Sequence, residues 1–403
     1  MLQPYRDDFN RRFTPEKYAE LRCEMERQTR TTVDFRICET PCFFPRAVLE
    51  DLAATGAELT HQLLDNPAYL KASLQAIPEL YRVSGNSPHP HFMTVDFGFV
   101  KEADGSLSPR LVELQAFPSV FGYQQVLANQ YIQTYDLDPT LTSLLGGHTE
   151  SSYWELLRRV ILGDHAPENV VLTEVEPDTQ KTLPDFHVYE DRLGIRTIDI
   201  ASLTKQGRRL YYERDGVLTP IHRIYNRAIA DEMERKGTKL QFDLRDDLDV
   251  EWAGHPNWYF QISKLSLPYL DHPSVPNAVF LDDWFATGGA GLPEDRNQLL
   301  LKPLYSFAGK GIQFAPSDAD LAAIPEEERR NYLIQQRIAF APIIDTPSGP
   351  TQAEVRILYL WPDNASLTPT ISLVRLGRGL MMGVDHNKNQ EWVGGSAALF
   401  PTA

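Results

Sequence analysis

The feature that most constrains the fold is a pair of strand-like segments joined by a turn. Residues 91–100 read HFMTVDFGFV, residues 110–115 read RLVELQ, and Asp104-Gly105 lies between them. Asp-Gly favours a two-residue turn, and alternating apolar and polar residues are typical of strands with two different faces. The segment therefore predicts an antiparallel hairpin, in which the residue numbers of each facing pair have a constant sum.

This register predicts that Asp96 faces Glu113 and that Thr94 faces Gln115, all on one face of the sheet. Two carboxylates directly opposite each other repel, unless a cation bridges them. Mg²⁺ prefers carboxylate and amide oxygens, so these residues are candidate metal ligands. The alternative is a solvated pair on an open sheet face. Pro109 cannot donate to the ladder, and a bulge there would shift the register.

A second candidate site is a glycine-rich loop within residues 297–314, NQLLLKPLYSFAGKGIQF. Its apolar strand carries Lys302, and the loop that follows leads into another strand. Small residues let backbone N–H groups approach phosphate oxygens, and lysines add positive charge. The loop lacks the Gly-Lys-Ser or Gly-Lys-Thr of a Walker A motif, and an ordinary turn is the alternative. The candidate phosphate-binding residues here are Ser306, Gly309, Lys310 and Gly311.

Further polar residues lie on strand-like segments around this loop. Several basic residues flanking one sheet in an acidic protein favour an anion-binding site over isolated surface charges. These flanking candidates are Lys264, Gln335, Gln336, Arg356 and Arg375.

The remaining patterns divide the chain into four parts. Residues 1–90 carry helical periodicity, with a helix start at Thr14-Pro15-Glu16, and we interpret them as a helical flank or substrate platform. Residues 166–254 are typical of an α/β unit that contains a hairpin around Asp215-Gly216. The expected parts are 1–90, the flank; 91–165, with the hairpin; 166–254, the α/β unit; and 255–403, a mixed α+β part.

Composition limits the partners and the compartment. The formal charge is −16, which disfavours nucleic acid and anionic membranes as partners, because both need a basic face. The 3 cysteines fit no zinc spacing, and we expect reduced thiols in a cytoplasmic protein. We expect neither a signal peptide nor a membrane span. The oligomeric state is not predicted.

Taken in order, these motifs resemble the ATP-grasp superfamily, in particular its circularly permuted branch with glutathionylspermidine synthase and related carboxylate–amine ligases. The similarity covers roughly residues 91–403. The family pattern of an aspartate followed by Glu-x-Asn matches TVDFGFV and VELQ, a nucleotide-lysine segment matches ISKLSLP, and the lid motif matches LLLKPLYSFAGKGI. Two positions depart from the pattern: Gln115 replaces asparagine, and Thr94 stands where the synthase has arginine.

The resemblance implies an α+β or α/β fold: a circularly permuted ATP-grasp with a preATP-grasp-like α/β domain and an N-terminal helical flank. It also implies that residues 255–403 are the nucleotide-binding part, with a lid at about 290–345. It implies ATP and Mg²⁺, with two ions, as cofactors. By this resemblance Asp96, Glu113 and Gln115 would bind metal. Lys264, Lys302 and the 306–311 loop would bind phosphates, and Gln335 and Gln336 would border adenine.

The implied activity is ATP-dependent ligation of a small-molecule carboxylate to an amine through an acylphosphate intermediate. Arg356 or Arg375 would hold the acyl oxygen or the γ-phosphate. Two alternatives stay open on the same scaffold, because fold alone does not choose among activities. One is a nucleotide-binding pseudoenzyme or regulatory binding protein, and the other is an ATP-dependent phosphotransferase.

Overall fold

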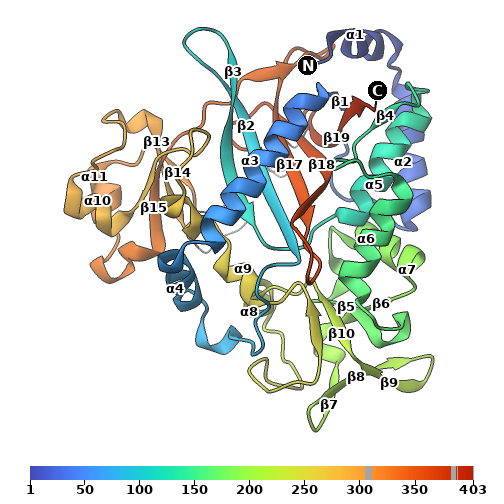
Figure 1. The fold of residues 1–403 in the computed structure, drawn as a ribbon. Helices are drawn as coiled ribbons and strands as arrows, with labels where there is room; N and C mark the ends of the chain where they lie inside the picture. The colour runs from blue at the N-terminus through green and yellow to red at the C-terminus, as the bar shows by residue number, and fades with distance from the viewer. Residues whose placement is uncertain (305–310, 383–386, 388, 403) are drawn as a thin grey trace.

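The computed structural model describes residues 1–403 except 305–310, 383–386, 388 and 403. It is a mixed α and β protein built around one large sheet (Figure 1). Within the described part of the chain this sheet has 8 strands, and its main path runs β1-β19-β18-β17-β2-β3. The strands are β1 (Cys42–Phe43), β2 (Phe92–Lys101), β3 (Leu107–Gln115), β4 (Leu141–Thr142), β16 (Pro342–Ile344), β17 (Thr351–Leu360), β18 (Thr368–Gly377) and β19 (Gly394–Pro401).

The β2–β3 hairpin has the predicted facing pairs at its far end but not the predicted turn. Asp96 pairs with Glu113 and Thr94 with Gln115. The turn is a longer loop in which Gly105 N donates to Glu102 O at 3.0 Å and Gly105 has a φ of +88°. The longer loop shifts the strand pairing near the turn by one residue, and a bulge between Asp96 and Phe97 reverses this shift. The expected two-residue turn is therefore wrong, and the register at the carboxylates is restored by the bulge.

One face of the large sheet is covered by the N-terminal flank. Alternate residues of β2 and β17 form a buried cluster with Leu49, Leu52 and Leu59 of α3 (Arg46–Leu64). This helix begins directly after Pro45 and lies across the sheet (Figure 1). A methyl group on Gly56 would lie 2.2 Å from Tyr359 Oη, so the close approach of helix and sheet requires glycine there.

The opposite face is covered along only part of its length. Phe92, Leu358 and Ile371 pack there in one cluster with Leu157 and other residues of α6 (Glu150–Leu162). Farther along the same strands and on the same face, apolar residues give way to the polar residues of the predicted site. The change from apolar to polar residues along one face marks where the helical cover ends.

The N-terminal flank is largely helical, as predicted. Thr14 caps α2 by accepting a hydrogen bond from Lys17 N, and Asn66 caps α4. β1 was not predicted from the sequence, and neither was β19, with which it pairs in parallel. The flank contains α1 (Gln3–Arg12), α2 (Pro15–Thr29), α3, α4 (Pro67–Gln75) and the 3₁₀ turn η1 (Glu79–Tyr81).

A parallel sheet of 4 described strands, ordered β11-β10-β5-β6, forms the α/β unit. The predicted turn at Asp215-Gly216 is confirmed, because Arg214 pairs with Val217 across these two residues. The unit contains β5 (Val170–Glu174), α7 (Leu183–Leu193), β6 (Arg196–Asp199), β7 (Thr204–Gln206), β8 (Arg209–Arg214), β9 (Val217–Ile221), β10 (Arg223–Asn226), α8 (Ala230–Lys236) and β11 (Glu251–Ala253). Between it and the hairpin lie α5 (Phe121–Thr134) and α6.

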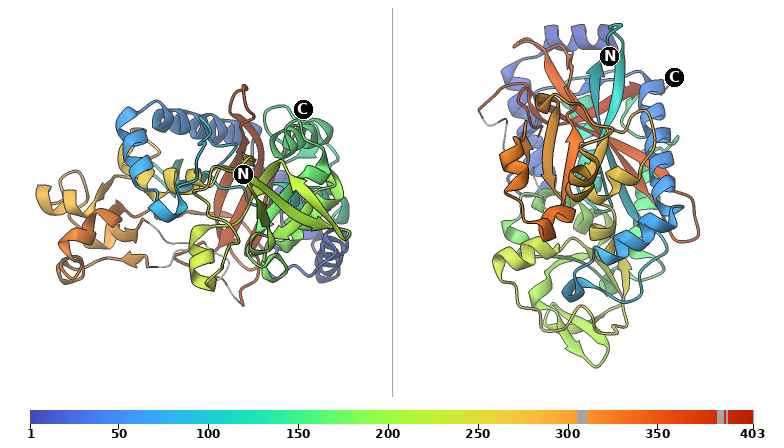
Figure 2. Two further views of the ribbon diagram at one scale, coloured as in Figure 1. Left: turned by 90° about the horizontal axis from the view of Figure 1, so that it is seen from below. Right: turned by 90° about the vertical axis from the view of Figure 1, so that its left-hand side faces the viewer.

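A smaller antiparallel sheet, ordered β12-β15-β13-β14, stands to one side of the large sheet (Figures 1 and 2). It includes β13, the predicted strand that carries Lys302. Its elements are β12 (Ala278–Phe280), α10 (Leu281–Thr287), β13 (Leu299–Pro303), β14 (Gln313–Phe314), α11 (Asp318–Ala322) and β15 (Tyr332–Gln336), and α9 (Asn257–Gln261) precedes them.

Across the described residues, every helix is too short or too polar to serve as a membrane span.

Candidate functional site

The main candidate site is a cleft between the small antiparallel sheet and the polar part of one face of the large sheet. Its volume is about 360 Å³. Seven of the predicted site residues line it: Glu113, Gln115, Lys264, Lys302, Gln335, Arg356 and Arg375. Sequence motifs as far apart along the chain as Glu113 and Arg375 therefore meet in one cavity.

The floor of the cleft is a network of carboxylates and guanidinium groups. Asp96 is fully buried, and Arg356 donates to both its oxygens, Nε to Oδ1 at 2.6 Å and Nη2 to Oδ2 at 2.6 Å. Arg375 also contacts Asp96 Oδ2, and it forms a second ion pair with Glu354. These contacts follow from strand pairing, since Arg356 on β17 lies directly opposite Asp96 on β2.

The other predicted metal ligands are more accessible than Asp96. The Glu113 side chain is 24% exposed, and its Oε1 lies 3.7 Å from Arg356 Nη2. Gln115 Nε2 donates to the same Glu113 oxygen at 2.9 Å. Thr94, at the position of the family's arginine, is buried, and its hydroxyl has no hydrogen-bond partner among the described residues.

Two lysines from different elements line the cleft. Lys302 on β13 is 8% exposed, and burial lowers the pKa of its ammonium to about 8, although Glu113 opposes this shift. Lys264 begins the 3₁₀ turn η5 (Lys264–Tyr269), and burial also lowers its pKa against the opposing effects of Glu113 and Asp231. Positive charge on a buried side chain is screened less by water and therefore attracts an anionic ligand more strongly than charge at the surface.

The two adjacent glutamines point in opposite directions. Gln335 is 1% exposed and lines the cleft, and its Oε1 has no hydrogen-bond partner among the described residues. Gln336 instead lines a separate hollow beside Asn277 and Asn297. Alternation along β15 explains the difference, and so only Gln335 faces the predicted site.

The predicted phosphate loop is described only at its end. Ser306, Gly309 and Lys310 lie outside the described residues. Gly311 is described, has a φ of +78°, and would place a Cβ 2.9 Å from Pro303 Cγ. Both the backbone conformation and the contact with Pro303 therefore favour glycine at the end of this loop.

Sequence reasoning missed Glu354 and the apolar walls of the cleft. Burial raises the pKa of Glu354 to about 7, and the Arg375 guanidinium opposes the shift. A signal for Glu354 exists in the sequence, because Glu354 and Arg356 are two apart on a strand and must share a face. The apolar walls come from Leu300, Ile312, Phe314, Ile338, Phe340, Leu380, Met381 and Met382.

Magnesium, which the resemblance in sequence implies, fits these residues in part. Glu113 and Gln115 supply accessible carboxylate and amide oxygens, which are suitable ligands. Asp96 does not fit in this arrangement, because guanidinium groups contact both its oxygens. Among the described residues, no group of three or more His, Cys, Asp or Glu side chains is arranged to hold a metal ion.

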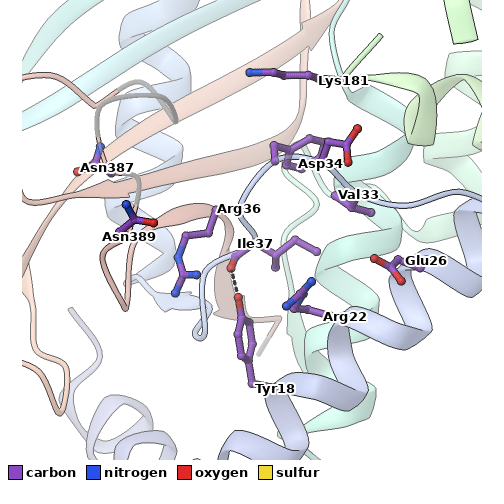
Figure 3. Close-up of a pocket in the computed structure, with 11 residues that line it drawn as sticks. Tyr18, Arg22, Glu26, Val33, Asp34, Arg36, Ile37, Lys181, Asn387 and Asn389 are labelled. Atoms are coloured by element: carbon purple, nitrogen blue, oxygen red, sulfur yellow. Dashed lines mark hydrogen bonds between the residues drawn. The ribbon is translucent and has the colours of Figure 1, made fainter. Parts of the chain in front are cut away.

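A second hollow of about 520 Å³ lies beside the N-terminal flank (Figure 3). Tyr18 and Arg22 from α2 line one side, and Asn387 and Asn389 line the other. Tyr18 Oη donates to Ile37 O at 2.7 Å and ties the helix to the following segment. The remaining lining residues include both charge signs: Glu26, Asp34, Arg36 and Lys181.

Comparison with known proteins supports the fold but shows no sequence family. No protein-family model matches the chain, and no curated protein sequence matches it. Among solved structures, the chain is similar to a glutathione synthetase-like effector from Globodera pallida in its apo form. The match has a TM-score of 0.59 at 10% sequence identity, and it covers 97% of this chain and 98% of that chain. The chain therefore has a glutathione synthetase-like fold, consistent with the expected ATP-grasp architecture.

Proposed function

We propose that the protein is an ATP-dependent carboxylate–amine ligase of the circularly permuted ATP-grasp type. The observation that carries this proposal is the composition of one cleft. It combines the buried Lys302, the half-buried Lys264, apolar walls and a buried glutamine with an unpartnered carbonyl oxygen. These groups complement, in turn, the phosphates, the flat base and the exocyclic amine of adenine nucleotides.

ATP and Mg²⁺ would supply the phosphoryl group that activates the carboxylate substrate, as an acylphosphate. Lys302 and Lys264 would hold the α- and β-phosphates, and Gln335 would accept a hydrogen bond from the adenine amino group. Glu113 and Gln115 would hold the metal that accompanies the nucleotide. Arg375 lies partly exposed at the end of the charged network, where it would bind an anionic oxygen of the reacting groups.

The hollow beside the N-terminal flank is a candidate location for the acid or the amine. Its cations and carboxylates complement both ends of a zwitterion. Met382 lines the cleft and Asn387 lines the hollow, so residues close together in sequence border both cavities. This placement favours the earlier interpretation of the flank as a substrate platform.

The first test is calorimetric titration of ATP in the presence of Mg²⁺. We expect saturable binding that weakens by about 10-fold to 100-fold in Lys302→Ala, because a charged hydrogen bond contributes roughly 1.5–3 kcal/mol. Lys236→Ala, a lysine substitution in the α/β unit, is the control and should bind ATP normally. Equal ATP affinity in wild type and Lys302→Ala would reject the nucleotide site.

The second test separates the three possible activities by their products. Wild-type protein is incubated with ATP, Mg²⁺ and mixtures of amino acids, peptides and polyamines, and product masses are measured. A ligase gives an amide together with ADP and free phosphate. A phosphorylated substrate would instead show a phosphotransferase, and ATP binding without ADP release would show a pseudoenzyme.

A further inference from the structure

The pair of facing carboxylates in the hairpin already has a cation beside it, and that cation belongs to the chain. Asp96 and Glu113 face each other, which led us to expect a bridging metal ion. Arg356 lies on β17, which pairs with the other side of β2, and it stands directly opposite Asp96. Its guanidinium makes two hydrogen bonds to Asp96 and lies 3.7 Å from Glu113.

We propose that Arg356 is the permanent counter-ion of the Asp96–Glu113 pair, and that Asp96 is not a metal ligand. A divalent ion in this cleft would then use Glu113 and Gln115 alone among these three residues. The inference refines the proposed function, because it lowers the number of protein ligands available to magnesium. Its central claim concerns the protein without nucleotide and can be tested separately from ATP binding.

The geometry of Asp96 is the first argument for this assignment. A bidentate guanidinium–carboxylate contact is among the strongest hydrogen-bonded pairs in proteins. Mg²⁺ requires oxygen ligands at about 2.0–2.1 Å in nearly octahedral order. Coordination by Asp96 would therefore require Arg356 or Arg375 to leave a carboxylate that is 0% exposed. Separating such a buried pair leaves an uncompensated charge, which is strongly unfavourable.

The charge of the cleft is the second argument. Its basic residues exceed its acids even when Asp96 is counted, so no metal is needed to neutralise the carboxylates. The basic residues are Lys264, Lys302, Arg337, Arg356 and Arg375, and the acids are Asp96, Glu113 and Glu354. Protein sites for Mg²⁺ commonly use one or two carboxylates and leave the remaining positions to phosphates and water. Glu113, with its partly exposed side chain, suits that arrangement.

The experiment uses the full chain without nucleotide, with Mn²⁺ as the probe. Ion binding is followed by electron paramagnetic resonance, and the melting temperature is measured with Mn²⁺ or with EDTA. Arg356→Met removes the guanidinium but keeps much of the apolar volume. We expect this variant to melt several degrees lower in EDTA, to gain a saturable Mn²⁺ site, and to recover thermal stability when Mn²⁺ is added.

Arg223→Met is the matched control. Arg223 is also buried and ion-paired, with Glu251 at 2.5 Å, but it lies in the α/β unit and donates to Ile161 O and Val160 O. Its loss should lower the melting temperature with no recovery by Mn²⁺. A melting temperature that Mn²⁺ restores in Arg356→Met but not in Arg223→Met supports the proposal. An equal rise of the melting temperature with Mn²⁺ in both variants would contradict it.

A second comparison does not depend on the folding of Arg356→Met. Wild type and Asp96→Asn are titrated with Mn²⁺ alone. We expect no saturable high-affinity site in either protein. A wild-type Mn²⁺ site that disappears in Asp96→Asn would overturn the proposal, because it would show Asp96 acting as a ligand. Failure of ATP binding would reject the proposed function but would leave this result unaffected.

Discussion

Lys302 belongs to the proposed binding site, and we expect its buried charge to make the fold less stable. Burial lowers the pKa of this lysine from 10.5 to about 8. The difference of about 2.5 units corresponds to roughly 3 kcal/mol of unfolding free energy at pH 7, at 1.36 kcal/mol per unit. Lys302→Met removes the buried charge and keeps an unbranched apolar side chain. We therefore expect the variant to be more stable than wild type by about 3 kcal/mol at pH 7.

The pH dependence has a definite sign. Below pH 8, Lys302 is charged in both the folded and the unfolded protein, and the full cost of burial is present. As the pH rises from 8 to 10.5, the folded state releases its proton first, so wild type gains stability relative to Lys302→Met. The difference in unfolding free energy between Lys302→Met and wild type should therefore fall from about 3 kcal/mol at pH 7 to about 1 kcal/mol at pH 9.5.

The assay is urea-induced unfolding of both proteins at the two pH values, followed by tryptophan fluorescence. Lys236→Met is the control with the opposite sign, because Lys236 pairs with Glu176 at 3.0 Å and with Glu232 at 3.2 Å. The unfolding free energy of Lys236→Met should be lower than that of wild type by a few tenths of a kcal/mol to about 1 kcal/mol. A Lys302→Met protein that is less stable than wild type at pH 7 would refute the reasoning.

Two further predictions test neighbouring parts of the structure. Gln335→Leu should weaken ATP binding by about 5-fold to 10-fold, the effect of one hydrogen bond, and leave tripolyphosphate binding unchanged in calorimetry. Gln336→Leu, on the opposite face of the strand, is its control, and equal losses in both would contradict the assignment of Gln335. Gly56→Ala should destabilise the fold by about 1–3 kcal/mol in urea unfolding, because its methyl group would lie 2.2 Å from Tyr359 Oη. Gly379→Ala, with its nearest contact at 3.7 Å, should have little effect, and an equal loss there would contradict the steric explanation.

Local features of the chain were predictable because neighbouring residues determine them. The cap at Thr14 starts a helix through its own side chain, and the turn at Asp215-Gly216 forms from two residues that accept positive φ. The Asp96–Glu113 pairing was also predicted, although its turn was not. The longer loop alone would have shifted the register by one residue, and only the bulge beyond Phe97 returns Glu113 to its position opposite Asp96.

The chemistry at that pair depends on a strand far away in the sequence. Alternation within the hairpin shows that two carboxylates face each other, but it does not show which strand lies on the other side of β2. That strand is β17, more than 200 residues later by approximate count, and it places Arg356 beside Asp96. The requirement for a cation was therefore readable from the hairpin, but the order of strands decides whether the cation is a metal or an arginine. Gln335 and Gln336 could not be told apart from the sequence for a similar reason. The position of β15 in its sheet decides which of the two side chains faces the cleft.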